Sequence, residues 1–206
     1  MEGDKAAVPV LTNCFVSPFG NRARIALRHK GVEYEEKLEN LAAKSPLLLS
    51  SNPVHGQGPR PHRRRQARAC YVDTKMPECA VRVWRSPTDV AAVEEGKKDM
   101  VAALKTLEDE LGAKPYFAGN ALGYVDVALV PFAPWFLTYE RLGGFSVAAK
   151  CPALAVWAAR CVRENECVAK SLPEPEHVFP VRLRHEEDAR PRLEAVCSRA
   201  SCKCSQ

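Results

Sequence analysis

The N-terminal part of the chain predicts a strand, a helix and a second strand, but no further strand follows to complete their sheet. Residues 8–14 are β-branched and apolar, residues 18–30 have the pattern of a helix, and residues 32–38 alternate as a second strand. Strands joined by a helix pair in parallel, and a stable sheet generally needs three or more strands with a covered face. Further strands are therefore expected, yet residues 56–66 contain no apolar run.

The predicted helix has clear boundary signals. Ser17 is a good N-cap, Pro18 suits the first helical position, and Gly31 supplies a left-handed stop. Residues 25–27 form an apolar side, and the basic residues are expected on a solvated face: Arg22, Arg24, Arg28 and Lys30. The hydroxyl of Ser17 then lies at the positive end of a helix dipole, which favours an anion.

The second half of the chain predicts helices alone, beginning near residue 67. Apolar residues at three- and four-residue spacing predict helices over 93–111, 124–139 and 152–161. Gly123 and Asp126 have the spacing of a capping motif, in which the carboxylate reaches back to backbone donors at the helix start. We therefore interpret Asp126 as a folding residue and not as a catalytic one.

Charge and cysteine content exclude several classes of protein. The net charge of +5 comes from residues 59–72 alone, because the other segments sum to zero. This arginine run has no interleaved aromatic residue and no helical period, so binding to nucleic acid is not expected. Nine cysteines form no CxxC pair, which favours reduced, mostly buried thiols and no metal. No stretch approaches the ~18 apolar residues of a membrane span, so we expect a cytosolic protein with no membrane partner.

Several motifs resemble those of plant tau-class glutathione transferases. They are Ser17-Pro18-Phe19-Gly20-Asn21-Arg22, Lys30-Gly31-Val32-Glu33-Tyr34-Glu35, Ser51-Asn52-Pro53-Val54-His55, Lys114-Pro115-Tyr116-Phe117 and Gly123-Tyr124-Val125-Asp126. The resemblance implies an α+β/α two-domain fold, with a truncated thioredoxin-like domain followed by an all-α domain. The expected boundaries are 1–58 for the first domain, 59–69 for an aberrant Arg-rich junction, 70–177 for the helical domain and 178–206 for a divergent tail.

The resemblance also assigns site residues. It implies that Ser17 stabilises the thiolate of glutathione and that Lys44 contacts the glycyl carboxylate of the same molecule. The alternatives are a plain N-cap for Ser17 and a solvated surface lysine for Lys44. Phe15 and Arg22 are candidates to border the electrophile or glutathione, with a core role for Phe15 and a solvated face for Arg22 as the alternatives.

The chain departs from the family pattern between His55 and Tyr71. The family places two strands and a helix here, with a Val-Pro or Ile-Pro turn and a Glu-Ser pair that hold glutathione. No Glu-Ser dipeptide occurs in this chain. If Gln57 to Arg68 is written as degenerate codons and read one base later, the new frame can spell Lys-Val-Pro-Val-Leu-Ile-Asp-Asp-Gly-Lys-Pro-Val. We interpret the arginine run as a shifted reading frame followed by a gap.

The function implied by the resemblance is the conjugation of glutathione, as co-substrate, to hydrophobic electrophiles by a homodimer. The alternative is a non-catalytic polypeptide that binds an apolar ligand or a partner through its helical domain, because half of the glutathione site is absent. Activity against a generic electrophile, with and without glutathione, separates the two hypotheses.

The shifted-frame interpretation makes a prediction for the product of an intact gene. Tryptic mass spectrometry of the native protein should find no peptide from residues 57–68, because the original frame would encode a strand, a turn and a strand there. Clear detection of such peptides would show that the arginine run is genuine.

Overall fold

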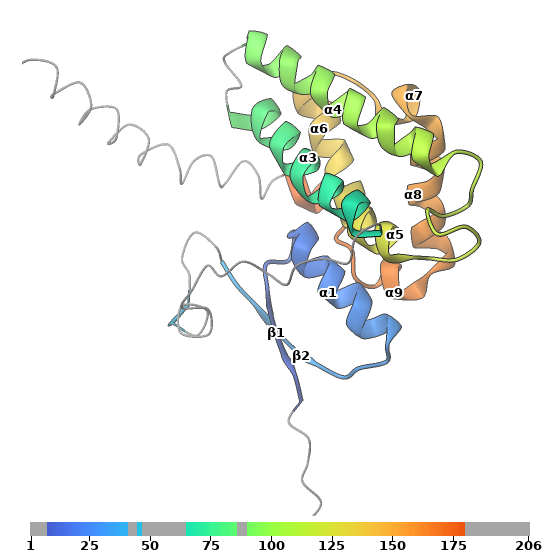
Figure 1. Ribbon diagram of the computed structural model, residues 1–206. Helices are drawn as coiled ribbons and strands as arrows, with labels where there is room; N and C mark the ends of the chain where they lie inside the picture. Colours follow the sequence, from blue (N-terminus) through green and yellow to red (C-terminus); the bar gives the residue numbers. More distant parts are fainter. Residues whose placement is uncertain (1–7, 41–44, 47–64, 86–89, 180–206) are drawn as a thin grey trace, which may run out of the picture.

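The computed structural model describes residues 8–40, 45–46, 65–85 and 90–179, and it places a small strand–helix–strand unit beside a helical domain (Figure 1). The unit comprises β1 (Val10–Asn13), α1 (Pro18–His29) and β2 (Glu35–Leu38). The helical domain comprises α3 (Arg65–Arg85), α4 (Val90–Leu111), α5 (Tyr124–Leu129), a 3₁₀ turn (Val130–Phe132), α6 (Ala133–Gly143), α7 (Val147–Lys150), α8 (Pro152–Glu164) and α9 (Glu166–Ala169).

The described sheet has two strands, which pair in parallel as the sequence predicts. Val10 lies opposite Glu35 and Asn13 lies opposite Leu38. Both strands are shorter than the alternating segments of the sequence, with four residues each. The predicted strand, helix and strand are therefore confirmed.

Three of the predicted helices are also confirmed, with one interruption. The apolar segment 124–139 contains a 3₁₀ turn between α5 and α6, and Pro131 and Pro134 lie there. Proline has no N–H to donate and its ring clashes with the preceding turn, so Pro131 in the 3₁₀ turn and Pro134 in the first turn of α6 disfavour a continuous α-helix here.

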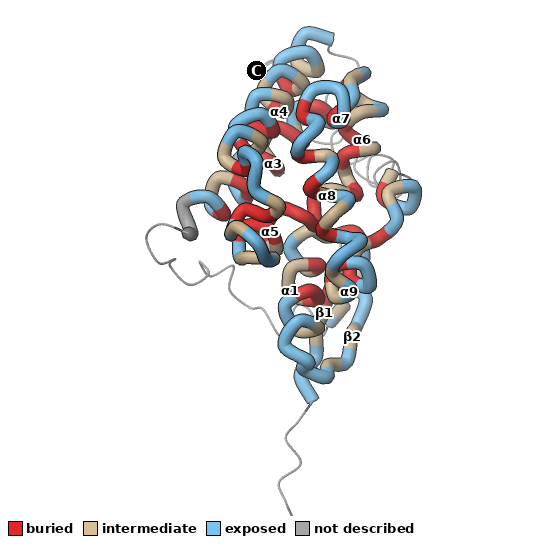
Figure 2. The backbone as a smooth tube through the Cα atoms, turned by 90° about the vertical axis from the view of Figure 1, so that its right-hand side faces the viewer, coloured by how far each residue is buried: buried red, intermediate tan, exposed pale blue. Residues whose placement is uncertain are grey.

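The core of the molecule lies in the helical domain, where the helices turn their buried sides toward one another (Figure 2). Trp157 and Tyr139 are its largest fully buried side chains. Gly96 of α4 lies against α3, where an added Cβ would come within 2.9 Å of Arg82 Cβ. Glycine is required there because the two backbones approach closely.

The prediction that the basic residues of α1 lie on a solvated face is wrong for Arg22 and Arg24. Arg24 is only 8% exposed and Arg22 packs against the helical domain. The periodicity of α1 identifies a polar side of the helix. Helix α5 and the segment around α9 cover this side, and their carbonyl groups accept hydrogen bonds from the two arginines.

Asp126 caps α5 from a fully buried position, as the motif predicts. Its Oδ2 accepts a hydrogen bond from Gly123 N–H at 2.9 Å, and its Oδ1 accepts one from Phe117 N–H at 2.9 Å and one from Trp157 Nε1–H at 2.8 Å. A buried carboxylate is tolerated only when donors satisfy it, and here three segments provide them. This confirms a structural role for Asp126.

The cysteines that the structure describes are free thiols: Cys14, Cys70, Cys79, Cys151, Cys161 and Cys167. Three are buried, and Cys70 alone among these six is exposed. Burial raises the pKa of the Cys151 thiol to about 11 and also raises that of Cys161, so both are protonated at neutral pH. Of the helices that the structure describes, none has the length and apolar content needed to cross a membrane.

We predict that Asp126→Ala lowers the free energy of unfolding by about 3 kcal/mol or more, because it leaves three N–H donors without their acceptor. Urea unfolding followed by circular dichroism at the helix band measures this change. Asp109 is exposed on α4 and serves as the control, and Asp109→Ala should change the free energy by less than about 0.5 kcal/mol. Equal effects of the two substitutions would contradict the structural role.

Candidate active site at the start of helix α1

Ser17 is the N-cap of α1, and its side chain is partly exposed. Its backbone is extended (φ −69°, ψ 118°), and its Oγ accepts a hydrogen bond from Gly20 N–H at 3.4 Å. The first turn of α1 contains no acidic residue, so nothing on the helix itself neutralises the positive end of its dipole. In the described part of the chain, the hydroxyl accepts this one long hydrogen bond and retains its own proton for donation.

The position of Ser17 depends on close packing between β1 and α1. Asn13 is buried at the end of β1, and its Nδ2 donates to Glu36 Oε1 at 3.3 Å. A Cβ added to Gly20 would lie 1.5 Å from Asn13 Oδ1, so a larger residue at this position would displace the Asn13 side chain. The sequence analysis missed Asn13 and Gly20, although a polar residue at the end of a strand and a glycine inside a helix were available signals.

Phe15 lies in the loop between β1 and α1 and is 40% exposed. The core role considered for this residue is therefore wrong. The guanidinium of Arg24 lies 5.9 Å from the centroid of the Phe15 ring. Phe15 is near the start of α1 and accessible, and its contact with an electrophile stays a prediction.

Arg22 connects α1 to the helical domain. Its Nε donates to the carbonyl oxygen of Ala128 at 2.8 Å, and its Nη1 forms an ion pair with Asp73 of α3. Its guanidinium also lies 5.1 Å from the ring centroid of Phe19 and 5.6 Å from that of Phe132. The solvated face proposed as an alternative for Arg22 is thus wrong, and its contact with a substrate stays a prediction.

Two further hydrogen bonds join the same unit to the helical domain. Trp135 Nε1 donates to the carbonyl oxygen of Val16 at 3.0 Å, directly before Ser17. Arg24 Nη1 donates to the carbonyl oxygen of Ser171 at 3.0 Å. The loop that carries Ser17 is therefore fixed from the helical side as well as from the sheet.

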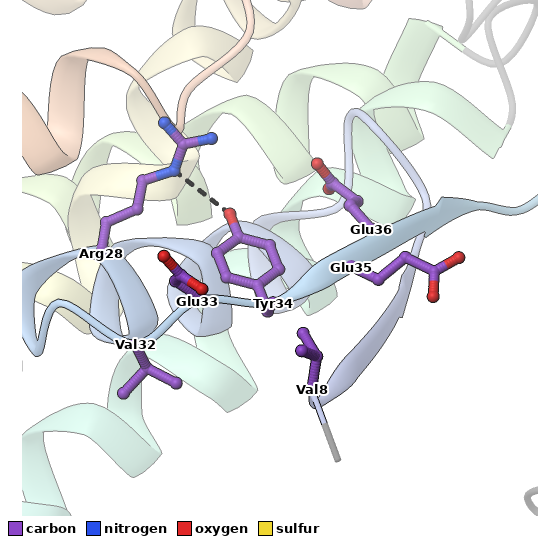
Figure 3. A pocket seen from close by; sticks show the side chains of 7 residues that line it. All are labelled: Val8, Arg28, Val32, Glu33, Tyr34, Glu35 and Glu36. Carbon is purple, nitrogen blue, oxygen red and sulfur yellow. Dashed lines mark hydrogen bonds between the residues drawn. The ribbon is translucent and has the colours of Figure 1, made fainter. Parts of the chain in front are cut away.

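Lys44 lies outside the described residues, so its predicted contact with the glycyl carboxylate stays a prediction. A separate hollow of about 580 Å³ lies beside β2 and is open to solvent. It is lined by Val8, Arg28, Val32, Glu33, Tyr34, Glu35 and Glu36, and Arg28 Nε donates to Tyr34 Oη at 3.1 Å across it (Figure 3). Ser17 does not line this hollow. The described residues contain no group of histidine, cysteine and carboxylate side chains able to hold a metal ion.

Comparison with known proteins agrees with this arrangement. The sequence profile of the glutathione S-transferase N-terminal domain matches residues 10–60, and that of the C-terminal domain matches residues 90–160. A probable glutathione S-transferase of Nicotiana tabacum, parA, is 43% identical over 212 residues, which cover 85% of this chain and 95% of the relative. Glutathione S-transferase U19 of Arabidopsis thaliana is 40% identical, over 82% of this chain and 91% of the relative.

Two solved structures share the fold. The structure of a rice glutathione transferase in complex with glutathione has a TM-score of 0.76 and 38% identity, and the match covers 86% of this chain and 97% of that one. The tau-class glutathione S-transferase of mango has a TM-score of 0.73 and 30% identity, and here the match covers 84% of this chain and 96% of the other.

The chain belongs to the glutathione S-transferase family, with an N-terminal thioredoxin-like domain and a helical C-terminal domain. Within that family it is a plant tau-class member, as its motifs predict. It is a transferase with glutathione as co-substrate.

The alignment with the tobacco relative also shows that this chain is shorter inside the aligned region. Of its 206 residues, 85% or about 175 are aligned, whereas the alignment spans 212 positions. About 37 positions, the difference between 212 and 175, therefore face no residue of this chain. The loss of part of the thioredoxin-like domain stays a prediction.

We predict that Arg22→Ala loosens α1 from the helical domain. Amide hydrogen exchange in residues 18–29 should accelerate about tenfold or more, because a hydrogen bond from a charged donor is worth about 1.5–3 kcal/mol. Mass spectrometry of peptides from α1 measures this exchange, and α4 should be unaffected. The control is Arg28→Ala, on the same helix but bonded to Tyr34 of the N-terminal unit. Equal exchange in the two variants would show that Arg22 does not hold α1.

Proposed function

We propose that this chain activates the thiol of glutathione at Ser17 and transfers the resulting thiolate to hydrophobic electrophiles. The observation that carries the proposal is the partly exposed hydroxyl of Ser17, which caps an unneutralised helix start. A free thiol titrates near ~8.5, and the thiolate is the nucleophile. A hydroxyl donor and a helix dipole both favour the thiolate, so together they lower the pKa of a bound thiol.

The chemical step needs little else from the protein. The thiol releases its proton to solvent water, Ser17 Oγ–H donates a hydrogen bond to the sulfur anion, and the sulfur electron pair forms a bond with an electrophilic carbon. In a substitution the leaving group departs with its electron pair, and in an addition the electrophile takes up a proton. No metal is needed for this step. Phe15, exposed beside the start of α1, provides an apolar surface suited to the electrophile.

The remaining contacts to glutathione are incomplete in this chain. We assign the glycyl carboxylate to Lys44, as the resemblance implies. The Glu-Ser pair for the γ-glutamyl end is absent from the sequence, and the described sheet lacks the turn that would pair with the peptide backbone. The proposed enzyme therefore keeps the groups that activate the thiol and has lost several that hold the rest of glutathione.

The proposal includes a cytosolic homodimer. The resemblance to tau-class glutathione transferases implies both the compartment and the dimer. Size-exclusion chromatography with light scattering of the purified chain tests the dimer.

We predict that Ser17→Ala lowers kcat/KM for glutathione about 100-fold or more, because one aimed donor is lost from the reacting atom. The loss should shrink as pH rises, since the midpoint of the pH–rate profile moves up toward ~8.5 when the thiolate loses its donor. Ser146 caps α7 in the same way, accepting a hydrogen bond from Ala149 N–H at 3.3 Å. Ser146→Ala is thus a control for the loss of a cap, and equal activity in both variants would reduce Ser17 to a plain N-cap.

The same assay compares this chain with a version in which the reading frame after residue 56 is restored and the missing segment with its Glu-Ser pair is supplied. The restored version should bind glutathione roughly two to four decades more tightly, from three or four hydrogen bonds worth about 0.5–3 kcal/mol each. Equal affinity of the two versions would show that the missing segment is dispensable.

A further inference from the structure

A largely buried glutamate on β2 contacts both β1 and α1. Glu36 Oε1 accepts a hydrogen bond from Asn13 Nδ2 at 3.3 Å and forms an ion pair with Arg24 Nε at 3.2 Å. The side chain of Arg24 is 9% exposed and that of Glu36 is 22% exposed. Burial removes both charges from water, and the attraction between them often does no more than offset that loss. Stability alone therefore does not account for a charged pair at this position.

The carboxylate of Glu36 determines which way the Asn13 amide faces. An ionised carboxylate can only accept hydrogen bonds, so it takes the NH₂ end of the amide and leaves Oδ1 on the opposite side. A Cβ built on Gly20 would be 1.5 Å from Asn13 Oδ1 and 3.0 Å from Nδ2, so the oxygen faces the helix. Gly20 is in the first turn of α1, where the positive end of the helix dipole favours an oxygen over an NH₂ group. Glu36 thus holds the favourable end of the amide against the start of α1.

Two contacts one helical turn apart hold α1 against the strands. Gly20 and Arg24 are separated by four positions in the sequence and therefore lie on the same side of the helix. Asn13 contacts the first of them and Glu36 contacts the second. Contacts at two points on one side resist both rotation and tilt of the helix, whereas a single contact acts as a pivot. The direction of Ser17 Oγ depends on this arrangement, because Gly20 N–H donates to that oxygen.

The guanidinium of Arg24 is also held from the helical domain. Its Nη1 donates to the carbonyl oxygen of Ser171 at 3.0 Å and to Oδ1 of the fully buried Asn21 at 3.3 Å. Arg24 therefore has little freedom to follow a displaced partner. It connects the helical domain to Glu36 and, through Glu36, to the start of α1.

We infer that Glu36 is a positioning residue for Ser17. Its carboxylate orients the Asn13 amide and, together with Arg24, fixes the direction in which Ser17 Oγ projects from the start of α1. The inference rests on the proposed function of Ser17 and adds to it a residue from a different element. Glu36 acts on the thiol only through Asn13 and helix α1.

Substitution of Glu36 tests the inference in assays of the full chain with glutathione and a generic electrophile. Glu36→Ala should lower kcat/KM for glutathione about tenfold or more, because a displaced hydroxyl donates poorly to the thiolate. The midpoint of the pH–rate profile should rise toward ~8.5, as for Ser17→Ala. Glu35→Ala is the matched control, since it removes the same charge from an exposed neighbour whose side chain leaves β2 in another direction (Figure 3). It should change neither quantity.

The conservative variant keeps the test independent of folding. Glu36→Gln retains an oxygen that can accept from Asn13 Nδ2, so it should keep most of the activity and the midpoint of the parent chain. A glutamine variant as impaired as the alanine variant would overturn the proposed orientation of the amide. Circular dichroism at the helix band verifies that each variant is folded.

A double-mutant cycle with Ser17 separates positioning from a general loss of stability. If Glu36 acts through Ser17, Glu36→Ala should reduce activity little or not at all once Ser17→Ala is present. Equal factors in both backgrounds would overturn the inference and leave the proposed function intact. A Ser17→Ala variant with full activity would instead refute the proposed function, and the inference with it.

Amide hydrogen exchange, measured by NMR, gives a readout that does not depend on activity. Gly20 N–H and Asn21 N–H are both bonded to Ser17, the first to Oγ and the second to the carbonyl oxygen. In Glu36→Ala these two amides should exchange about tenfold faster, because the first turn is released, while residues 26–29 should be unaffected. Unchanged exchange at the first turn, or equal acceleration along the whole of α1, would overturn the inference.

Discussion

Two parallel strands and one helix do not form a stable layer alone, so the N-terminal unit of this chain depends on the helical domain. Three hydrogen bonds to backbone carbonyl groups cross between them, from Arg22 to Ala128, from Arg24 to Ser171 and from Trp135 to Val16, and Arg22 also pairs with Asp73 of α3. Two of the donors are guanidinium groups that are largely buried, and such donors are costly to leave unpaired. Helix α1 therefore belongs to the core of the helical domain as much as to its own sheet, and its buried Ile25 is part of that core.

The same contacts define the chemistry at Ser17. On one side Asn13 packs into the space left by Gly20, and on the other Trp135 holds the carbonyl group of Val16. The serine thus lies between two fixed points, and its hydroxyl projects from a helix start whose dipole is not neutralised. Activation of a thiol needs this local arrangement. Holding the whole glutathione molecule needs further strands. Thiol activation and glutathione binding can therefore be lost separately.

The features that the sequence predicted are those whose partners lie nearby in the chain. The N-cap at Ser17 and the capping motif of Asp126 involve residues three positions apart, and the structure has both. The roles of Arg22 and Arg24 were not predictable, because their acceptors lie 106 and 147 residues further along. Periodicity assigned these arginines to a solvated face, since it detects a polar side without showing what covers it. Similarly, the third bond of Asp126, from Trp157, needed the packing of α8 on α5. The aberrant Arg-rich junction stays a prediction, which rests on codon arithmetic and the missing Glu-Ser pair and not on local propensity.

The distance along the chain between Arg24 and Ser171 has a consequence for biosynthesis. The N-terminal unit leaves the ribosome first, but the acceptor of Arg24 is translated 147 residues later. At about 5–20 residues per second this corresponds to a delay of roughly 7 to 30 s. During that interval the guanidinium groups remain hydrated, because the surface that will cover α1 does not yet exist. The nascent chain therefore passes through a stage in which chaperone binding or premature strand pairing competes with folding.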